Sequence, residues 1–223
     1  LSEPLATFMQ NSHFGPDCPD QAKYRNFVQD AYLYLLQIPR LLIILNVVAA
    51  SKIFKIVFDF KREFVDYLDP TSEPYTNGLF YLSGRMYIGA KGMLDPSRFN
   101  EVVSVIAHEL CHYAMFLVYG NFARPYKVKD KVRKREFEEI VEDCKQKSHF
   151  ESLIHLVFTA YPFSMQHAEL IVRVPHMMVL YHENPKVLEL KKKTYPSLFN
   201  KFEDSCLPDM EKAIPKIKKR FRS

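Results

Sequence analysis

The feature that most constrains this chain is an HExxH motif, His108-Glu109-Leu110-Cys111-His112, inside the apolar stretch 96–120. Residues four apart in a helix share one face, so both imidazoles can reach one zinc ion. Glu109 follows the first histidine, where a base can take a proton from a zinc-activated water. The motif therefore predicts a helix that carries two metal ligands and a general base.

The residues around the motif support a buried helix. Asp95 can cap the N-terminus, Pro96 suits the first helical position, and Gly120-Asn121 is typical of a helix end. Between these signals the stretch is apolar on nearly every side, as in a helix inside a core. Two histidines and a glutamate are costly to bury there without partners, which a metal ion supplies. Core histidines satisfied by hydrogen bonds are the alternative interpretation.

Length and composition predict one domain over residues 1–223. A chain of 223 residues, 48% of them hydrophobic, can bury one substantial core. We expect residues 1–19, which contain Pro4, Gly15, Pro16 and Pro19, to be irregular, and residues 195–223 to form a C-terminal helix with a basic tail. The six glycines form no GxGxxG or GxxxxGK motif, which argues against a phosphate-binding loop.

The net charge of +5 is a modest excess that lies mainly in three basic runs, residues 127–135, 191–193 and 216–222. Such runs are usually solvated faces, and contact with nucleic acid or an anionic membrane is the alternative. The longest apolar run, Leu41 to Ala50, is too short to cross a bilayer. We therefore expect no transmembrane segment.

The four cysteines, Cys18, Cys111, Cys144 and Cys206, form no CxxC pair, which argues against a cysteine zinc site. Cys111 lies within the HExxH motif, beside a predicted ligand. So few cysteines, together with no recognisable signal peptide, favour an intracellular location.

Ahead of the motif, the pattern predicts helices and then strands. Apolar residues at helical spacing over residues 20–38 predict a helix that ends at Pro39. Residues 40–68 fit either a buried helix followed by a strand or a mostly helical segment, since periodicity does not resolve a continuous apolar run. We expect a turn region from Asp69 to Gly78 and a β-hairpin over residues 79–90. After the motif, residues 129–147 predict an exposed amphipathic helix, and two prolines interrupt a strongly apolar stretch over residues 151–182.

Residues 85–119 resemble the minimal zincin metallopeptidases in the order of strand Met86–Ala90, connection and helix Val105–His112. The HELCH segment looks most like the SprT-type proteases, which take a third zinc ligand from a histidine soon after the motif. The equivalent stretch here, Tyr119–Val128, holds no histidine. The resemblance is therefore to a gluzincin-like site, in which a later helix supplies a glutamate.

This resemblance also implies a substrate-binding strand. In zinc peptidases an edge strand ahead of the HExxH helix binds the substrate backbone by strand addition. We therefore expect Tyr87, Ile88, Gly89 and Ala90 to border the cleft and to pair with an extended peptide.

A catalytic zinc site needs three protein ligands and one open position. Glu169 is a lone carboxylate in an apolar segment that should be buried, and we expect it to be the third ligand. Arg173, four residues on, would then orient Glu169. An ion pair between these two residues is the alternative, and Glu138 or His167 would be next in line as ligand.

The expected fold is α+β, with helices packed on a small twisted sheet and an HExxH active-site helix in a zincin-like arrangement. The expected function is peptide hydrolysis, with zinc on His108, His112 and Glu169 and with Glu109 as general base. His176 and Tyr181 are candidate donors to the developing oxyanion, although a satisfied core position would also account for each. The alternatives are a catalytically silent binding module and a nucleic-acid-associated SprT-like protease.

Overall fold

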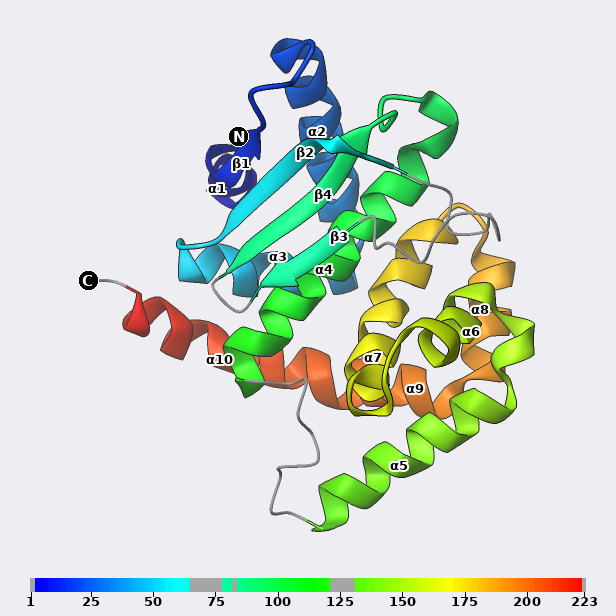
Figure 1. Cartoon of the computed structure of the whole chain (residues 1–223). Helices are drawn as coiled ribbons and strands as arrows, with labels where there is room; N and C mark the ends of the chain where they lie inside the picture. The colour runs from blue at the N-terminus through cyan, green and yellow to red at the C-terminus, as the bar shows by residue number, and fades with distance from the viewer. Residues whose placement is uncertain (1–2, 65–77, 82–83, 121–130, 222–223) are drawn as a thin grey trace.

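The computed structural model describes residues 3–64, 78–81, 84–120 and 131–221, which form an α+β fold dominated by helices (Figure 1). The strands are β1 (Ser12–Phe14), β2 (Lys55–Glu63), β3 (Gly78–Tyr81) and β4 (Arg85–Lys91). The helices are α1 (Glu3–Asn11), α2 (Gln21–Leu36), α3 (Pro39–Ser51), α4 (Phe99–Tyr119), α5 (Lys131–Gln146), α6 (Ser152–Ala160), α7 (Phe163–Leu180), α8 (Pro185–Thr194), α9 (Pro196–Asn200) and α10 (Leu207–Arg220). A π-helical turn, Lys201–Cys206, joins the last two helices.

The four strands form one sheet in the order β1-β2-β4-β3. β1, β2 and β4 run parallel, and β3 pairs antiparallel with β4 as the other arm of the predicted hairpin. Met86, Ile88 and Ala90 alternate along β4 and are almost fully buried, so this face of the sheet joins the core. In Figure 1, α3 and α4 lie behind the sheet, and α7 lies beside α4 on the side away from β1.

β4 lies inside the sheet and not at its edge. Tyr87 is in register with Val57 of β2 on one side and with Leu79 of β3 on the other. Ile88 is likewise paired on both sides, and Gly89 and Ala90 are buried. The prediction that Tyr87, Ile88, Gly89 and Ala90 form an exposed substrate-binding edge is therefore wrong. The hairpin partner takes the backbone groups of Tyr87 and Ile88 that a substrate strand would need.

α4 confirms the predicted motif helix. The Asp95 side chain accepts a hydrogen bond from the Ser97 backbone N–H and caps a short 3₁₀ turn, Pro96–Arg98, from which α4 continues. The helix ends at Gly120, which has a φ of 76°. Glycine adopts this backbone conformation with little strain because it has no Cβ. α4 packs against α7, α3 and the sheet, so the apolar residues that surround the motif are core residues.

The length and hydropathy of Pro96–Tyr119 would suit a membrane span, but 72% of its most apolar window is buried inside the fold. α2 and α3 pass the same test only as a pair, and they are bent by 118° at the break between them. In the part of the chain that the structure describes, the apolar helix at the motif is thus a core helix packed on its neighbours.

Several other predicted elements are confirmed. α2 lies within the predicted helix, with Asp20 as its cap, and the segment after Pro39 resolves into a buried helix followed by a strand, α3 and β2. α5 matches the predicted amphipathic helix, and the apolar stretch after it forms α6 and α7. Residues 69–77 of the expected turn region lie outside the residues that the structure describes. Its last residue, Gly78, is the first residue of β3.

The prediction that residues 1–19 are irregular is wrong. Residues 3–11 form α1, and the three residues of β1 pair in parallel with β2. Phe8 is 1% exposed, and its ring lies 5.1 Å from the rings of both Tyr32 and Phe54. Pro4 does not prevent the helix, because proline fits its first turn. Packing against α2 and the strand region therefore orders a segment whose local composition indicated a loop.

The burial of Phe8 predicts that the N-terminal segment stabilises the whole domain. Phe8→Ala should lower the free energy of unfolding by about 3–5 kcal/mol, because it removes a buried aromatic ring and leaves a cavity. Urea denaturation followed by circular dichroism measures this loss. Gln10→Ala, at an exposed position of the same helix, is the control and should change stability little. Equal stability of the two variants would show that α1 is not part of the cooperative core.

Candidate metal centre

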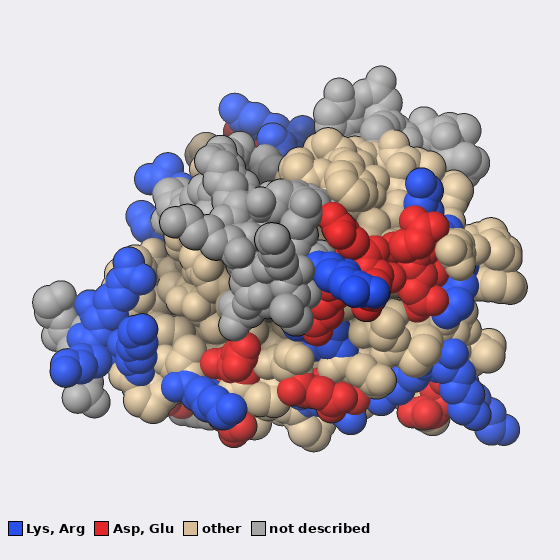
Figure 2. Space-filling view, turned by 90° about the horizontal axis from the view of Figure 1, so that it is seen from below, with Lys and Arg blue, Asp and Glu red and all other residues tan. Residues whose placement is uncertain are grey.

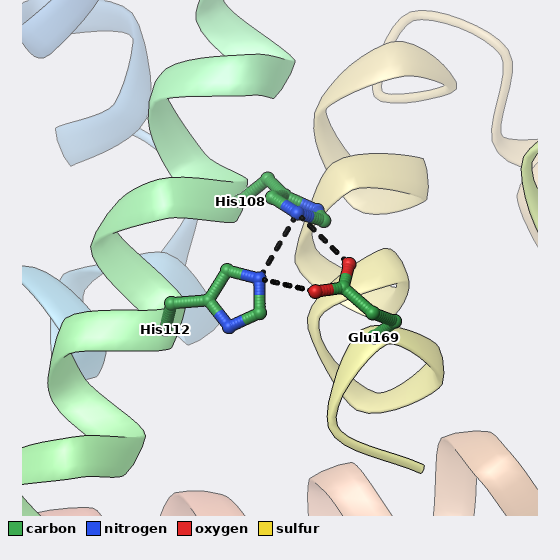
Figure 3. A group of neighbouring side chains, drawn as sticks. All are labelled: His108, His112 and Glu169. Atoms are coloured by element: carbon green, nitrogen blue, oxygen red, sulfur yellow. Dashed lines mark hydrogen bonds and ion pairs between the residues drawn. The ribbon is translucent and has the colours of Figure 1, made fainter. Parts of the chain in front are cut away.

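The crossing of α4 and α7 brings three ionisable side chains together (Figure 3). His108 and His112 lie one turn apart on α4, and Glu169 faces them from α7. α7 begins after Pro162 and is buried almost continuously from His167 to Val179. Because both helices are apolar around nearly their whole circumference, they pack closely and hold these groups away from solvent.

The donor atoms of the three side chains lie within a few ångströms of one another. His108 Nε2 and His112 Nε2 are 3.2 Å apart. Glu169 uses both oxygens, with Oε1 3.3 Å from His112 Nε2 and Oε2 3.6 Å from His108 Nε2. One nitrogen or oxygen from each of the three residues fits within a 4.8 Å group, so the set can hold a metal ion.

These spacings fit a tetrahedral metal site. Two ligand atoms at about 2.0–2.2 Å from one ion, at the tetrahedral angle, lie about 3.3–3.6 Å apart. The two histidine nitrogens are 3.2 Å apart, and each lies 3.3 or 3.6 Å from a different oxygen of Glu169, so a small shift of the carboxylate would let one of its oxygens share an ion with both rings. Two imidazoles and one carboxylate also leave a fourth tetrahedral position for water or substrate.

Burial and nearby charges keep His108 and Glu169 in the protonation states that bind a metal ion. Burial, with the nearby Arg173 charge, lowers the pKa of His108 to about 3, so its ring is neutral near pH 7. Burial alone would raise the pKa of Glu169, but the two histidines hold that pKa well below its ordinary value. A neutral imidazole and an ionised carboxylate are the forms that bind metal ions.

The raised pKa of His112 shows that the site favours positive charge. Burial acts to lower the pKa of His112, yet the Glu169 carboxylate outweighs burial and the pKa is raised above its ordinary value. Proton and metal ion would compete for this nitrogen. A buried carboxylate facing two imidazoles therefore favours a cation between them.

Glu109 lies beside the donor group without belonging to it. Its Oε1 is 3.9 Å from His108 Nε2, and its Oε2 has no hydrogen-bond partner among the described residues. The side chain is 5% exposed, and burial, opposed by the His112 charge, raises the pKa of Glu109 to about 7. A carboxyl group with a pKa near neutrality can both take up and release a proton.

Gly78, which no sequence pattern marked as a site residue, lies directly against Glu109. A Cβ at this position would lie 2.6 Å from Glu109 Cγ and 2.7 Å from Cδ, and real Cβ atoms essentially never come within 3.0 Å of such a neighbour. Gly78 is not among the glycines with positive φ, so what requires glycine here is space and not backbone conformation. The sequence signal is the Asn77-Gly78 pair in a chain with six glycines, but such a pair by itself indicates only a turn.

Arg173 and His176 lie behind the donor group on α7. Arg173 Nη1 donates a hydrogen bond to His176 Nδ1 over 3.3 Å, and both residues are 1% exposed. The ring of His176 meets that of His108 edge-on, with centroids 5.7 Å apart. Neither the expectation that Arg173 orients Glu169 nor the alternative of an ion pair between them is supported, since the ion-pair partners of Glu169 are the two histidines. His176 lies at the site, as expected of a candidate donor.

Tyr181 belongs to a different cluster. Its hydroxyl donates to Glu151 Oε2 over 3.1 Å, and Lys191 lies over its ring. Tyr181 follows α7 at its C-terminal end, twelve residues and about 18 Å of helix from Glu169. The assignment of Tyr181 as an oxyanion donor is therefore wrong for this arrangement.

The other candidate ligands lie apart from the donor group. Glu138 is exposed on α5. His167 is buried against Phe137, with ring centroids 3.9 Å apart, and lies two residues before Glu169, on another face of α7. The buried carboxylate at Glu169 is thus the candidate that reaches the motif histidines, while its role as a metal ligand stays a prediction.

Comparison with known proteins adds no relative. Protein-family models, curated protein sequences and solved structures gave no match to this chain. The interpretation of the site therefore depends on its own geometry.

The geometry predicts that Glu169 is needed for metal binding. Glu169→Gln keeps the shape of the side chain but removes the charge that balances the cation. Its metal affinity should fall by more than the roughly 10–100-fold typical of losing a residue that supports a ligand. Competition with a chromophoric chelator measures this affinity. Glu139→Gln, at an exposed residue paired with Arg135, is the control and should bind metal like the parent protein.

Proposed function

We propose that the protein is a zinc-dependent metallopeptidase with a gluzincin-like centre, in which His108, His112 and Glu169 hold the ion. The observation that carries this proposal is the buried group of two HExxH histidines and a glutamate from a second helix. Zinc is favoured over magnesium or calcium because two of the three donors are imidazole nitrogens, whereas those ions take oxygen ligands. The strand–helix order of residues 85–119 supports the zincin-like assignment.

A zinc ion in this group would act as a Lewis acid on a substrate carbonyl and would lower the pKa of a water molecule. Glu109 then acts as the general base, taking a proton from the attacking water and delivering it to the leaving amine. Its burial and raised pKa suit both halves of that transfer. A purely structural metal site would not need such a carboxylate beside the ligands, which favours hydrolysis over a silent binding module.

The remaining residues of the site position these groups. Gly78 gives Glu109 room beside β3, and His176, linked to Arg173, packs on the ring of His108. To stabilise the developing oxyanion, the His176 ring would have to reach the substrate. Because His176 is only 1% exposed, we assign it instead to holding the ring of His108 in place.

The substrate strand is better assigned to β3 than to β4. β3 is the last strand in the sheet order, and its first residue lies against Glu109. An extended peptide added along β3 would therefore run past the base and the metal ligands. Backbone pairing of this kind reads little side-chain identity, so the geometry supports peptide hydrolysis without indicating a preferred sequence.

The test of the proposed function is the matched pair of wild type and Glu109→Gln. We expect wild-type protein with about one zinc per chain to cleave members of a peptide library. Glu109→Gln should retain zinc and the fold while turnover falls roughly 10²–10⁴-fold, because the positioned base is lost. Full activity in Glu109→Gln would contradict the mechanism. No cleavage by zinc-loaded wild type would favour the binding module instead.

The close contact at Gly78 predicts a second loss of activity. In Gly78→Ala the added methyl group must displace Glu109, and misplacing a catalytic group by about 1 Å can cost on the order of 10²-fold. The zinc content of the variant should be unchanged, because no metal ligand is touched.

Gly15→Ala is the matched control, since a Cβ there would meet nothing closer than 3.6 Å. Equal kcat values for the two alanine variants would refute the role of Gly78.

A further inference from the structure

The end of α10 and the turn between α3 and β2 form one continuous surface away from the metal ligands. We call it the basic corner and define it by Lys52, Ile53, Lys216, Lys218, Arg220 and Phe221. Lys52, Lys218 and Phe221 line a pocket of about 360 Å³, and Ile53, Lys216, Arg220 and Phe221 line a second pocket of about 520 Å³. Because Phe221 borders both pockets, the end of α10 and the turn between α3 and β2 belong to one patch.

The patch is strongly cationic. Four of its six residues carry a positive charge, and Glu3 is the one acidic residue among the described linings of the two pockets. Figure 2, which views the molecule from below, shows Lys and Arg gathered at the edge where α10 ends. The Asp and Glu side chains visible on that face lie farther along it. An anionic surface would therefore meet attraction with little opposing charge.

An apolar side chain projects from the middle of this charge. Ile53 is 58% exposed, although it is a large aliphatic residue next to the core residue Phe54. It follows Lys52, which has a φ of 59° and is the one residue other than glycine with positive φ in the described part of the chain. This turn presents a lysine and then an isoleucine to solvent, an arrangement that the core does not require.

We propose that the basic corner docks the protein on the surface of an anionic phospholipid membrane. Ile53 enters the headgroup region, and the surrounding lysines and Arg220 contact lipid phosphates. Basic side chains around an exposed apolar residue match the two attractions of such a surface, charge from anionic lipids and apolar area at the acyl boundary.

Nucleic acid is the less suitable partner for this surface. Binding along single strands usually combines cations with exposed aromatic rings on which bases stack, and duplex binding depends on polar contacts to phosphate and base edges. The exposed non-polar residue here is aliphatic, and Phe221 is partly buried. Both binding modes weaken with salt, so a direct comparison of the two ligands is needed.

The test is co-sedimentation of the full chain with vesicles of phosphatidylcholine alone or of phosphatidylcholine mixed with phosphatidylserine. We expect binding to the mixed vesicles, weakened by added salt, and little binding to neutral ones. A fluorescent DNA duplex measured under the same conditions gives the competing outcome. Binding to the duplex without binding to mixed vesicles would overturn the proposal, as would equal binding to both kinds of vesicle.

Two matched pairs of variants locate the binding surface. Lys216→Gln with Lys218→Gln should weaken partitioning to mixed vesicles about 30-fold, since each basic residue near such a surface contributes about fivefold (~1 kcal/mol). Lys145→Gln with Lys186→Gln is the control, because both residues are exposed on other helices and both double variants change the net charge from +5 to +3. Equal weakening in the two double variants would mean that net charge and not the basic corner governs binding.

Ile53→Asn tests the apolar contact. It should weaken partitioning roughly tenfold, in line with the loss of a partly inserted aliphatic side chain. Leu190→Asn is its control, since Leu190 is 60% exposed on α8, and it should bind like the parent protein. No difference between these two variants would refute the inserted position of Ile53. Thermal unfolding of all variants checks that each is folded.

Discussion

The attraction between Glu169 and the two motif histidines, across the contact of α4 and α7, is the interaction on which the centre of this molecule depends. Both helices are buried, so each ionisable group there has given up its hydration. The cost is tolerable only if opposite charges and lone pairs are arranged around a shared point, and the 3.2–3.6 Å separations provide that point. The caps of α4, the packing of α7 and the sheet beneath them serve to hold these distances.

The sheet contributes through its last strand and not through the strand that leads into α4. Hairpin pairing encloses β4, while β3 brings the backbone of Gly78 against Glu109. Main chain thus shapes one side of the Glu109 carboxylate, and imidazole rings shape the other. Main-chain atoms in a sheet are held more firmly than most side chains, so this contact restricts the carboxylate without supplying a hydrogen bond to it.

Local signals in the sequence were sufficient where one segment determines its own structure. The caps at Asp95 and Gly120 delimited the motif helix, and an apolar environment singled out Glu169 among the later carboxylates. The failures concern contacts between side chains or elements, whether near or distant in the chain. Composition could not show that Phe8 packs on Tyr32 and Phe54, that β2 pairs with β4 on the side opposite β3, or that Arg173 turns to His176. Register and side-chain direction are set by tertiary packing, which periodicity does not encode.

The pocket that α1 and α10 both line has a consequence for how the described elements can be connected. Glu3 and Phe221, near the two ends of the described chain, line the same pocket. Chains with neighbouring ends commonly tolerate circular permutation, because a short linker can join them and new ends can open at an exposed loop. The order in which α1 and α10 follow each other in the chain is then secondary to their shared place beside this pocket. Within the described residues, α1 and α10 therefore belong to one corner of the fold, although the whole of the intervening chain separates them.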